Sequence, residues 1–81
     1  MLENIAVIPL YVVIVRITDS KKGMTWEQQV YIGTDYGKAH GSAFIATQEE
    51  WPDSVTELKS VIRHYHIKAD GTISYILETE V

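Results

Sequence analysis

Hydrophobic and polar positions alternate near the start of the chain as a β-hairpin requires. Residues 10–18 are rich in β-branched and aromatic side chains, residues 19–23 are polar, and residues 25–33 return as a second strand. Pairing of Thr18 with Met24 would gather apolar side chains on one face. We predict that this face is the core side, with Leu10, Val12, Ile14, Val30 and Ile32.

The first strand is apolar on its other face as well. A strand that is buried on both sides is usually central in its sheet, or it is covered by a partner. We expect a central strand with a helix over one face and loops over the other. The alternative is a dimer or partner face formed by Tyr11, Val13, Val15 and Ile17.

A second hairpin is indicated at the C-terminal end, where Asp70-Gly71 separates two β-rich runs. A three-residue loop at 69–71 would put Gly71 where a type I turn with a G1 bulge needs a left-handed residue. This register pairs Lys68 with Thr72, Ile67 with Ile73 and Tyr65 with Tyr75. It predicts a core face of Tyr65, Ile67, Ile73, Tyr75 and Leu77, with His64 and His66 on the outer face.

Residues 34–50 fit a helical face through Tyr36, Ala39 and Ala43. Gly37 and Gly41 oppose this interpretation, because each glycine would cost about 1 kcal/mol inside a helix. A loop followed by a short strand at 43–47 is the alternative.

Residues 54–64 are predicted to form a helix. Val55, Leu58 and Ile62 recur at helical spacing, and Ser54-Val-Thr-Glu57 has the form of a capping box. The alternative extends the strand of the second hairpin back toward Leu58. Together these elements predict an α+β fold: a small single domain over residues 1–81, with an antiparallel four-stranded sheet of two hairpins and one or two helices packed on one face.

Length and composition narrow the classes of protein that remain. The 81 residues include no cysteine, which excludes disulfides and thiolate metal sites and fits a reducing compartment. The longest apolar run, residues 5–15, contains Pro9 and is too short to cross a bilayer. Residues 1–4 are acidic-polar, unlike the basic start of a signal peptide. We therefore expect a cytoplasmic protein with no membrane partner.

The net charge of −4 argues against a nucleic-acid partner, since phosphate binding needs basic surfaces. A nucleic-acid-binding sheet is kept as a further alternative. Lys21 and Lys22 at the first hairpin tip are interpreted as solubilising residues, and no glycine-rich nucleotide loop is present.

Acidic and aromatic side chains gather in the middle of the sequence. They favour a non-enzymatic protein-interaction module without a cofactor, in the format of a small phage-type inhibitor that binds a larger host or defence protein. An exposed apolar strand face would also fit a homodimer. The predicted partner-binding residues are Glu49, Glu50, Trp51, Asp53 and Tyr36.

The histidines provide the alternative function, a metal- or ligand-binding domain. His64 and His66 lie two apart on a predicted strand and so share a face, and His40 could approach them from the uncertain middle segment. No nucleophile with a positioned base can be identified, so no catalytic residue is predicted.

Overall fold

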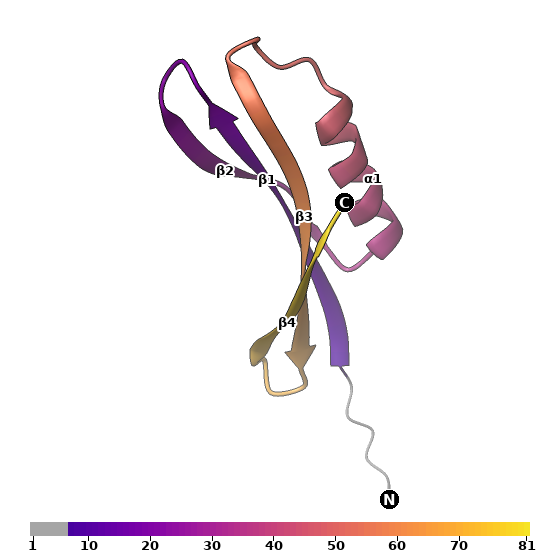
Figure 1. The fold of residues 1–81 in the computed structure, drawn as a ribbon. Coiled ribbons are helices and arrows are strands. Elements are labelled where there is room, and N and C mark those ends of the chain that lie inside the picture. Colours follow the sequence, from indigo (N-terminus) through magenta and orange to yellow (C-terminus); the bar gives the residue numbers. More distant parts are fainter. Residues whose placement is uncertain (1–6) are drawn as a thin grey trace, which may run out of the picture.

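The computed structural model describes residues 7–81 as a single sheet with one helix (Figure 1). All strand pairs are antiparallel, and the strand order is β2-β1-β3-β4. The α+β prediction is confirmed, with one helix packed on the sheet; the acidic start at residues 1–4 lies outside the described residues. The elements are β1 (Val7–Asp19), β2 (Met24–Gly33), α1 (Tyr36–Gln48), β3 (Val55–Lys68) and β4 (Ile73–Glu80).

The first hairpin forms with a register one residue away from the predicted one. Thr18 pairs with Thr25 instead of Met24, and Asp19 is the last residue of the ladder. The Asp19 carboxylate explains this, because Oδ1 accepts the backbone N–H groups of Lys21 (3.0 Å) and Lys22 (3.1 Å) and so closes the turn. Gly23 completes the turn with φ +63°.

The core lies on the side of β1 opposite to the predicted one. Val13, Val15 and Ile17 are at most 1% exposed beneath α1, whereas the face with Leu10 and Val12 is turned away from the helix. The prediction of the core side was therefore wrong. The prediction of a central β1 with a helix over one face holds, but within residues 7–81 no loop covers the other face. An irregularity between Val13 and Ile14 shifts the β2 ladder further.

Helix α1 forms despite its two glycines, so the alternative of a strand at 43–47 is wrong. Asp35 caps it by accepting the N–H of Lys38 at 3.1 Å. Its inner face is lined by Ala39, Ala43 and Ala46, whose small side chains let the helix lie close to the sheet. Residues Val13, Val15, Ile17 and Ile62 lie beneath it.

The helix predicted over 54–64 is wrong, because this segment is the first part of β3. It pairs with β1 along nearly its whole length, which satisfies the backbone groups on the facing edges of both long strands. Ser54 does not act as a helix cap; its Oγ donates to Asp19 Oδ2 at 3.1 Å. Leu58, Ser60 and Ile62 alternate toward α1, a period of two that the sequence pattern also permits.

The C-terminal hairpin has the predicted loop. Ile67 pairs with Ile73 and Tyr65 with Tyr75, and the N–H of Lys68 donates to the Thr72 carbonyl at 2.8 Å. Gly71 has φ +87°, as the turn requires.

The core assignment of this hairpin is wrong in two respects. A bulge between His64 and Tyr65 pairs Leu77 with His64, so Leu77 leaves the predicted face. That face is also not buried, since Ile73 and Tyr75 are each 57% exposed. The physical reason is that α1 covers the opposite face of the sheet.

The fold is long and narrow, with principal extents of 59 × 22 × 15 Å. Its radius of gyration is 15.7 Å, whereas a compact chain of this length has about 12 Å. Figure 1 shows the reason: α1 lies against the upper part of the sheet, and the start of β1 with the β3–β4 turn extends below it. This lower part of the sheet has no second layer among residues 7–81.

Candidate protein-interaction surface

The face of the sheet that points away from α1 carries two apolar rows that cross three strands. The ladder places Ile8, Ile67 and Ile73 side by side in one row. The second row, next to it, consists of Leu10, Tyr65 and Tyr75, and the two tyrosine rings meet edge to face at 5.7 Å. We call these six residues the open apolar face. Ile8 is 51% exposed, and the β4 residues are more exposed still.

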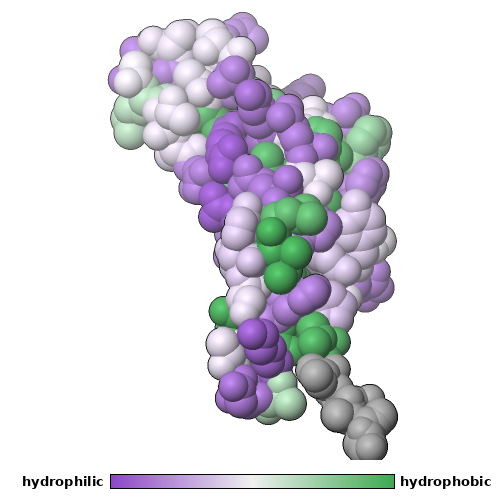
Figure 2. All heavy atoms as spheres, turned by 60° about the horizontal axis from the view of Figure 1, so that its bottom comes forward, coloured by the Kyte–Doolittle hydropathy of each residue, from purple (hydrophilic) through white to green (hydrophobic). Residues whose placement is uncertain are grey.

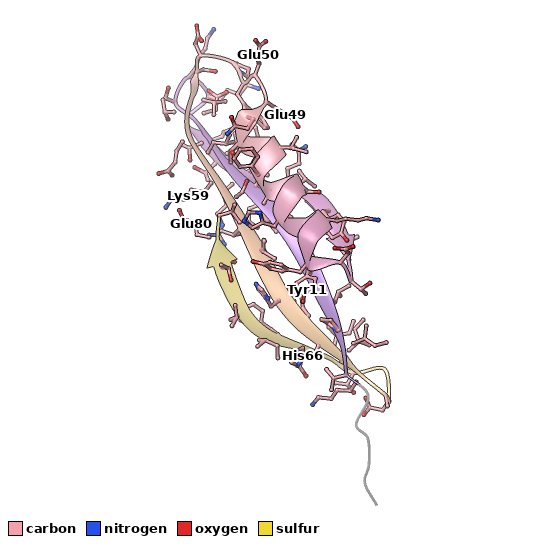
Figure 3. The ribbon with its side chains drawn as sticks, turned by 90° about the vertical axis from the view of Figure 1, so that its right-hand side faces the viewer. Tyr11, Glu49, Glu50, Lys59, His66 and Glu80 are labelled. Carbon is pink, nitrogen blue, oxygen red and sulfur yellow. The ribbon has the colours of Figure 1, made fainter. Side chains whose placement is uncertain are left out.

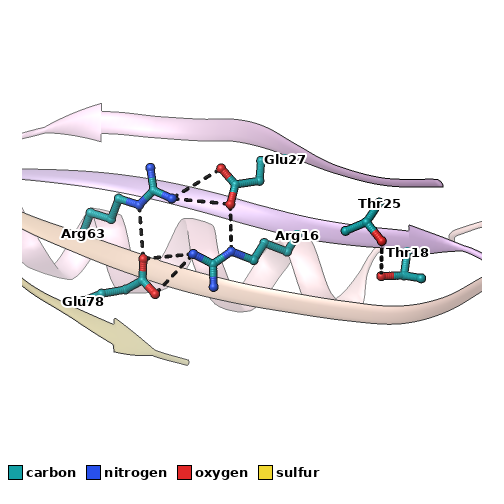
Figure 4. A network of polar contacts seen from close by, with 6 residues as sticks. All are labelled: Arg16, Thr18, Thr25, Glu27, Arg63 and Glu78. Carbon is teal, nitrogen blue, oxygen red and sulfur yellow. Dashed lines mark hydrogen bonds and ion pairs between the residues drawn. The ribbon is translucent and has the colours of Figure 1, made fainter.

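Beyond these rows, the same face carries a closed ring of ion pairs. Arg16 Nε lies 2.8 Å from Glu27 Oε2, and Arg16 Nη2 lies 3.2 Å from Glu78 Oε1. Arg63 completes the ring, with Nε 3.1 Å from Glu78 Oε1 and Nη2 3.3 Å from Glu27 Oε1. Figure 4 shows the four side chains joining all four strands, with α1 behind the sheet.

The ring is electrically neutral and internally satisfied. The hydrogen bond from Arg16 holds the pKa of Glu27 below its usual value, and Glu78 raises the pKa of Arg63. The ring also explains why two residues of the uncovered face are buried. Ile14 of β1 pairs with Val61 of β3, and this pair lies between Arg16 and Arg63 on the same face. The two residues are only 7% and 2% exposed.

The predicted partner-binding residues do not form one site. Trp51 serves the core: its Nε1–H donates to the Ala46 carbonyl at 3.1 Å, and its ring packs against the cluster of Val15, Ile17 and Ala46. Tyr36 lies at the other end of α1, about 20 Å away along a 13-residue helix, with its ring centroid 5.3 Å from that of Tyr11.

The three acidic residues of the prediction do lie together in sequence after α1 and are exposed. Glu49 and Glu50 stand at the end of the helix in Figure 3, and Asp53 precedes β3. Glu49, Glu50 and Asp53, which we call the acidic end, take part in no ion pair within residues 7–81. Ile45 lies one helical turn before Glu49 and is 59% exposed.

The predicted dimer face was wrong. Val13, Val15 and Ile17 are buried by α1, and Tyr11 is half-buried at the helix N-terminus, where Figure 3 shows it. The uncovered apolar surface belongs to the opposite face of the same strand.

The histidines are placed by packing within the chain. His64 Nε2 shares a hydrogen bond of 3.0 Å with Thr79 Oγ1. The centroid of its ring lies 5.3 Å from that of the Tyr11 ring and 5.9 Å from that of the Tyr36 ring. The ring of His40 lies beside the same Tyr36 ring, with 6.2 Å between the ring centroids. His66 lies further down the sheet, where it pairs with Pro9 of β1. Across residues 7–81, no three His, Asp or Glu side chains are grouped so that they could hold a metal ion.

Sequence reasoning missed both the ring and the open apolar face. A signal for the ring was present, because Arg16 and Arg63 each interrupt an apolar strand and have opposite charges available on the neighbouring strands. Finding it required the strand order, which places β1 beside β3. The exposure of Ile73 and Tyr75 had no local signal, since it depends on which face the helix covers.

The described residues contain no pocket, and no helix among them is long and apolar enough to cross a membrane. Comparison of the chain with protein-family models, with curated proteins and with solved structures finds no match. The surface features are therefore the basis for a functional proposal.

Proposed function

We propose that the chain is a non-enzymatic protein-interaction module that binds through the open apolar face. The observation that carries this proposal is the pair of partly exposed apolar rows beside a ring of charges that satisfy one another. Stable protein interfaces combine an apolar centre with a polar rim, and tyrosine and arginine are enriched in them. Figure 2 shows hydrophobic side chains grouped in the lower half of the molecule, between hydrophilic ones.

A photo-cross-linking experiment tests this role in cells that make the protein. The photoreactive amino acid p-benzoylphenylalanine replaces Tyr75 in one variant and Lys22, in the exposed hairpin turn far from the open apolar face, in a matched control. We expect a discrete protein adduct from position 75 and none from position 22. If position 75 gives no adduct, or only the smear that position 22 also gives, the open apolar face is not a protein-binding surface.

A second candidate surface is the acidic end. Its three carboxylates lack ion pairs within the described residues, and the exposed Ile45 lies beside them. This combination fits the basic surface of a larger protein, as in an inhibitor that occupies a host or defence protein. Charge would contribute mainly through steering and specificity.

Charge reversal tests the inhibitor role. The partner is first identified by cross-linking from a photoreactive amino acid at position 50 of the otherwise wild-type chain. We expect the triple variant Glu49→Lys, Glu50→Lys, Asp53→Lys to bind this partner more weakly. Raised salt should also weaken the binding of the wild type. The matched control uses Glu49→Gln, Glu50→Gln and Asp53→Asn, which remove charge without reversing it and should have a smaller effect. Unchanged affinity in the reversed variant would contradict this role.

A further inference from the structure

The lower part of the sheet carries apolar side chains that no other element of residues 7–81 covers. Ile8, Ile73 and Tyr75 of the open apolar face are 51–57% exposed, and Leu10, Tyr65 and Ile67 are partly exposed beside them, so the face is an apolar patch of the kind that marks an interaction site. They are contiguous, because the two rows are neighbours in the ladder of β1, β3 and β4.

The core that the described residues form by themselves is small. It contains nine buried hydrophobic residues, and three of these are the alanines of α1. A chain of this length buries only about 60% of its unfolded surface even when it is compact, and this fold is elongated. A second copy of the chain is a cover that is present wherever the chain is made.

The charge distribution permits two open faces to approach each other. The ring of Arg16, Glu27, Arg63 and Glu78 is neutral, so the centre of the face has no excess charge. The acidic end lies beyond the last turn of α1, away from the apolar rows. A two-fold interface needs a patch that complements itself, and apolar rows beside a neutral ring satisfy that requirement.

We infer that the open apolar face packs against the same face of a second copy, which forms a two-sheet sandwich with α1 on the outside of each half. This inference rests on the proposed protein-binding role of the open apolar face. Packed sheets lie about 10 Å apart, so the tyrosine and isoleucine rows would interdigitate, and the ion-pair ring would form the polar border. Specific interfaces bury about 1,200 Å² or more in total, so the interface must include the ion-pair ring as well as the apolar rows.

Analytical ultracentrifugation of the pure protein tests the dimer. We expect twice the mass of a single chain for the wild type, and a dissociation constant at least about 30-fold higher for the Ile73→Lys, Tyr75→Lys variant. The matched control is Phe44→Lys, which changes a similarly exposed apolar residue (54%) on α1 and should leave the dimer intact. A single-chain mass at every concentration, or a dimer lost only in the Phe44→Lys control, overturns the inference.

A second measurement covers the case in which the lysine variant does not fold. The melting temperature of the wild type should rise with protein concentration, because association stabilises the folded chain. A melting temperature that is independent of concentration overturns the dimer. A monomer that still cross-links from position 75 to a different protein also overturns it but supports the proposed binding role, whereas a monomer without any adduct contradicts both.

Discussion

The two faces of this one sheet differ in how their apolar residues are covered. On the inner face, Val13 and Ile62 are fully buried under the alanines of α1. On the other face, charged side chains cover Ile14 and Val61, and the rows around Tyr65 and Tyr75 lie in the open. Since both faces belong to the same strands, strand composition alone does not tell core from interface. The layer that lies against each face decides it.

The largest expected effect is on the inner face. Ile17→Ala should lower the free energy of unfolding by about 3 kcal/mol, because Ile17 is fully buried and its truncation leaves a cavity next to α1. Urea denaturation followed by circular dichroism measures this. Ile32→Ala is the matched control on the other face at 56% exposure, and it should cost far less. If both variants lost the same free energy of unfolding, the two faces would not differ in burial.

A smaller effect is expected where polar groups join the helix to the sheet. Ser60 is fully buried, and its Oγ donates to the Ala43 carbonyl at 2.9 Å. Ser60→Ala should destabilise the fold by about 1 kcal/mol, the usual net value of one such hydrogen bond. Ser74→Ala, on β4 away from the buried core, is the control in the same denaturation experiment. A loss as large in the control would contradict this role of Ser60.

A change of similar size but opposite sign is expected at Gly41 in α1. A Cβ at Gly41 would meet no atom within 4 Å, and its φ is not positive. Gly41→Ala should therefore stabilise the helix by about 0.5–1 kcal/mol. Gly71→Ala is the contrasting variant, because the left-handed φ of Gly71 makes any side chain unfavourable. A rise in the melting temperature for Gly71→Ala, or a fall for Gly41→Ala, would refute this assignment.

The smallest effect concerns the ion-pair ring and its dependence on pH. Because the folded-state pKa of Glu27 is lowered below its ordinary 4.5, the stability from its charge is complete above that value. It is lost as the pH falls from about 4.5 through the lowered folded value. Glu27→Gln should reduce the acid dependence of unfolding in this window, whereas Glu49→Gln should not. An NMR titration of the Glu27 carboxyl carbon should show the lowered pKa directly.

Local signals were sufficient where a turn controls a strand pair. Asp70-Gly71 predicted the loop and the first pairs of the C-terminal hairpin, and the pattern of 10–18 and 25–33 predicted the other hairpin. The register of the first hairpin was missed by one residue because the Asp19 side chain closes a shorter turn. The helical face proposed within 34–50 formed as α1, whereas the helix predicted over 54–64 was wrong, since Val55, Leu58 and Ile62 fit both a helical and a strand period.

The sequence by itself determined the α+β class, both hairpins and the absence of any disulfide, because these depend on neighbouring residues and on composition. Only the tertiary structure decided that β3 pairs with β1 over nearly its whole length and that α1 covers the Val13 side of the sheet. Those choices depend on contacts between residues far apart in the chain. They also decided that the predicted dimer residues lie in the core, while the predicted core residues Ile73 and Tyr75 lie on the surface.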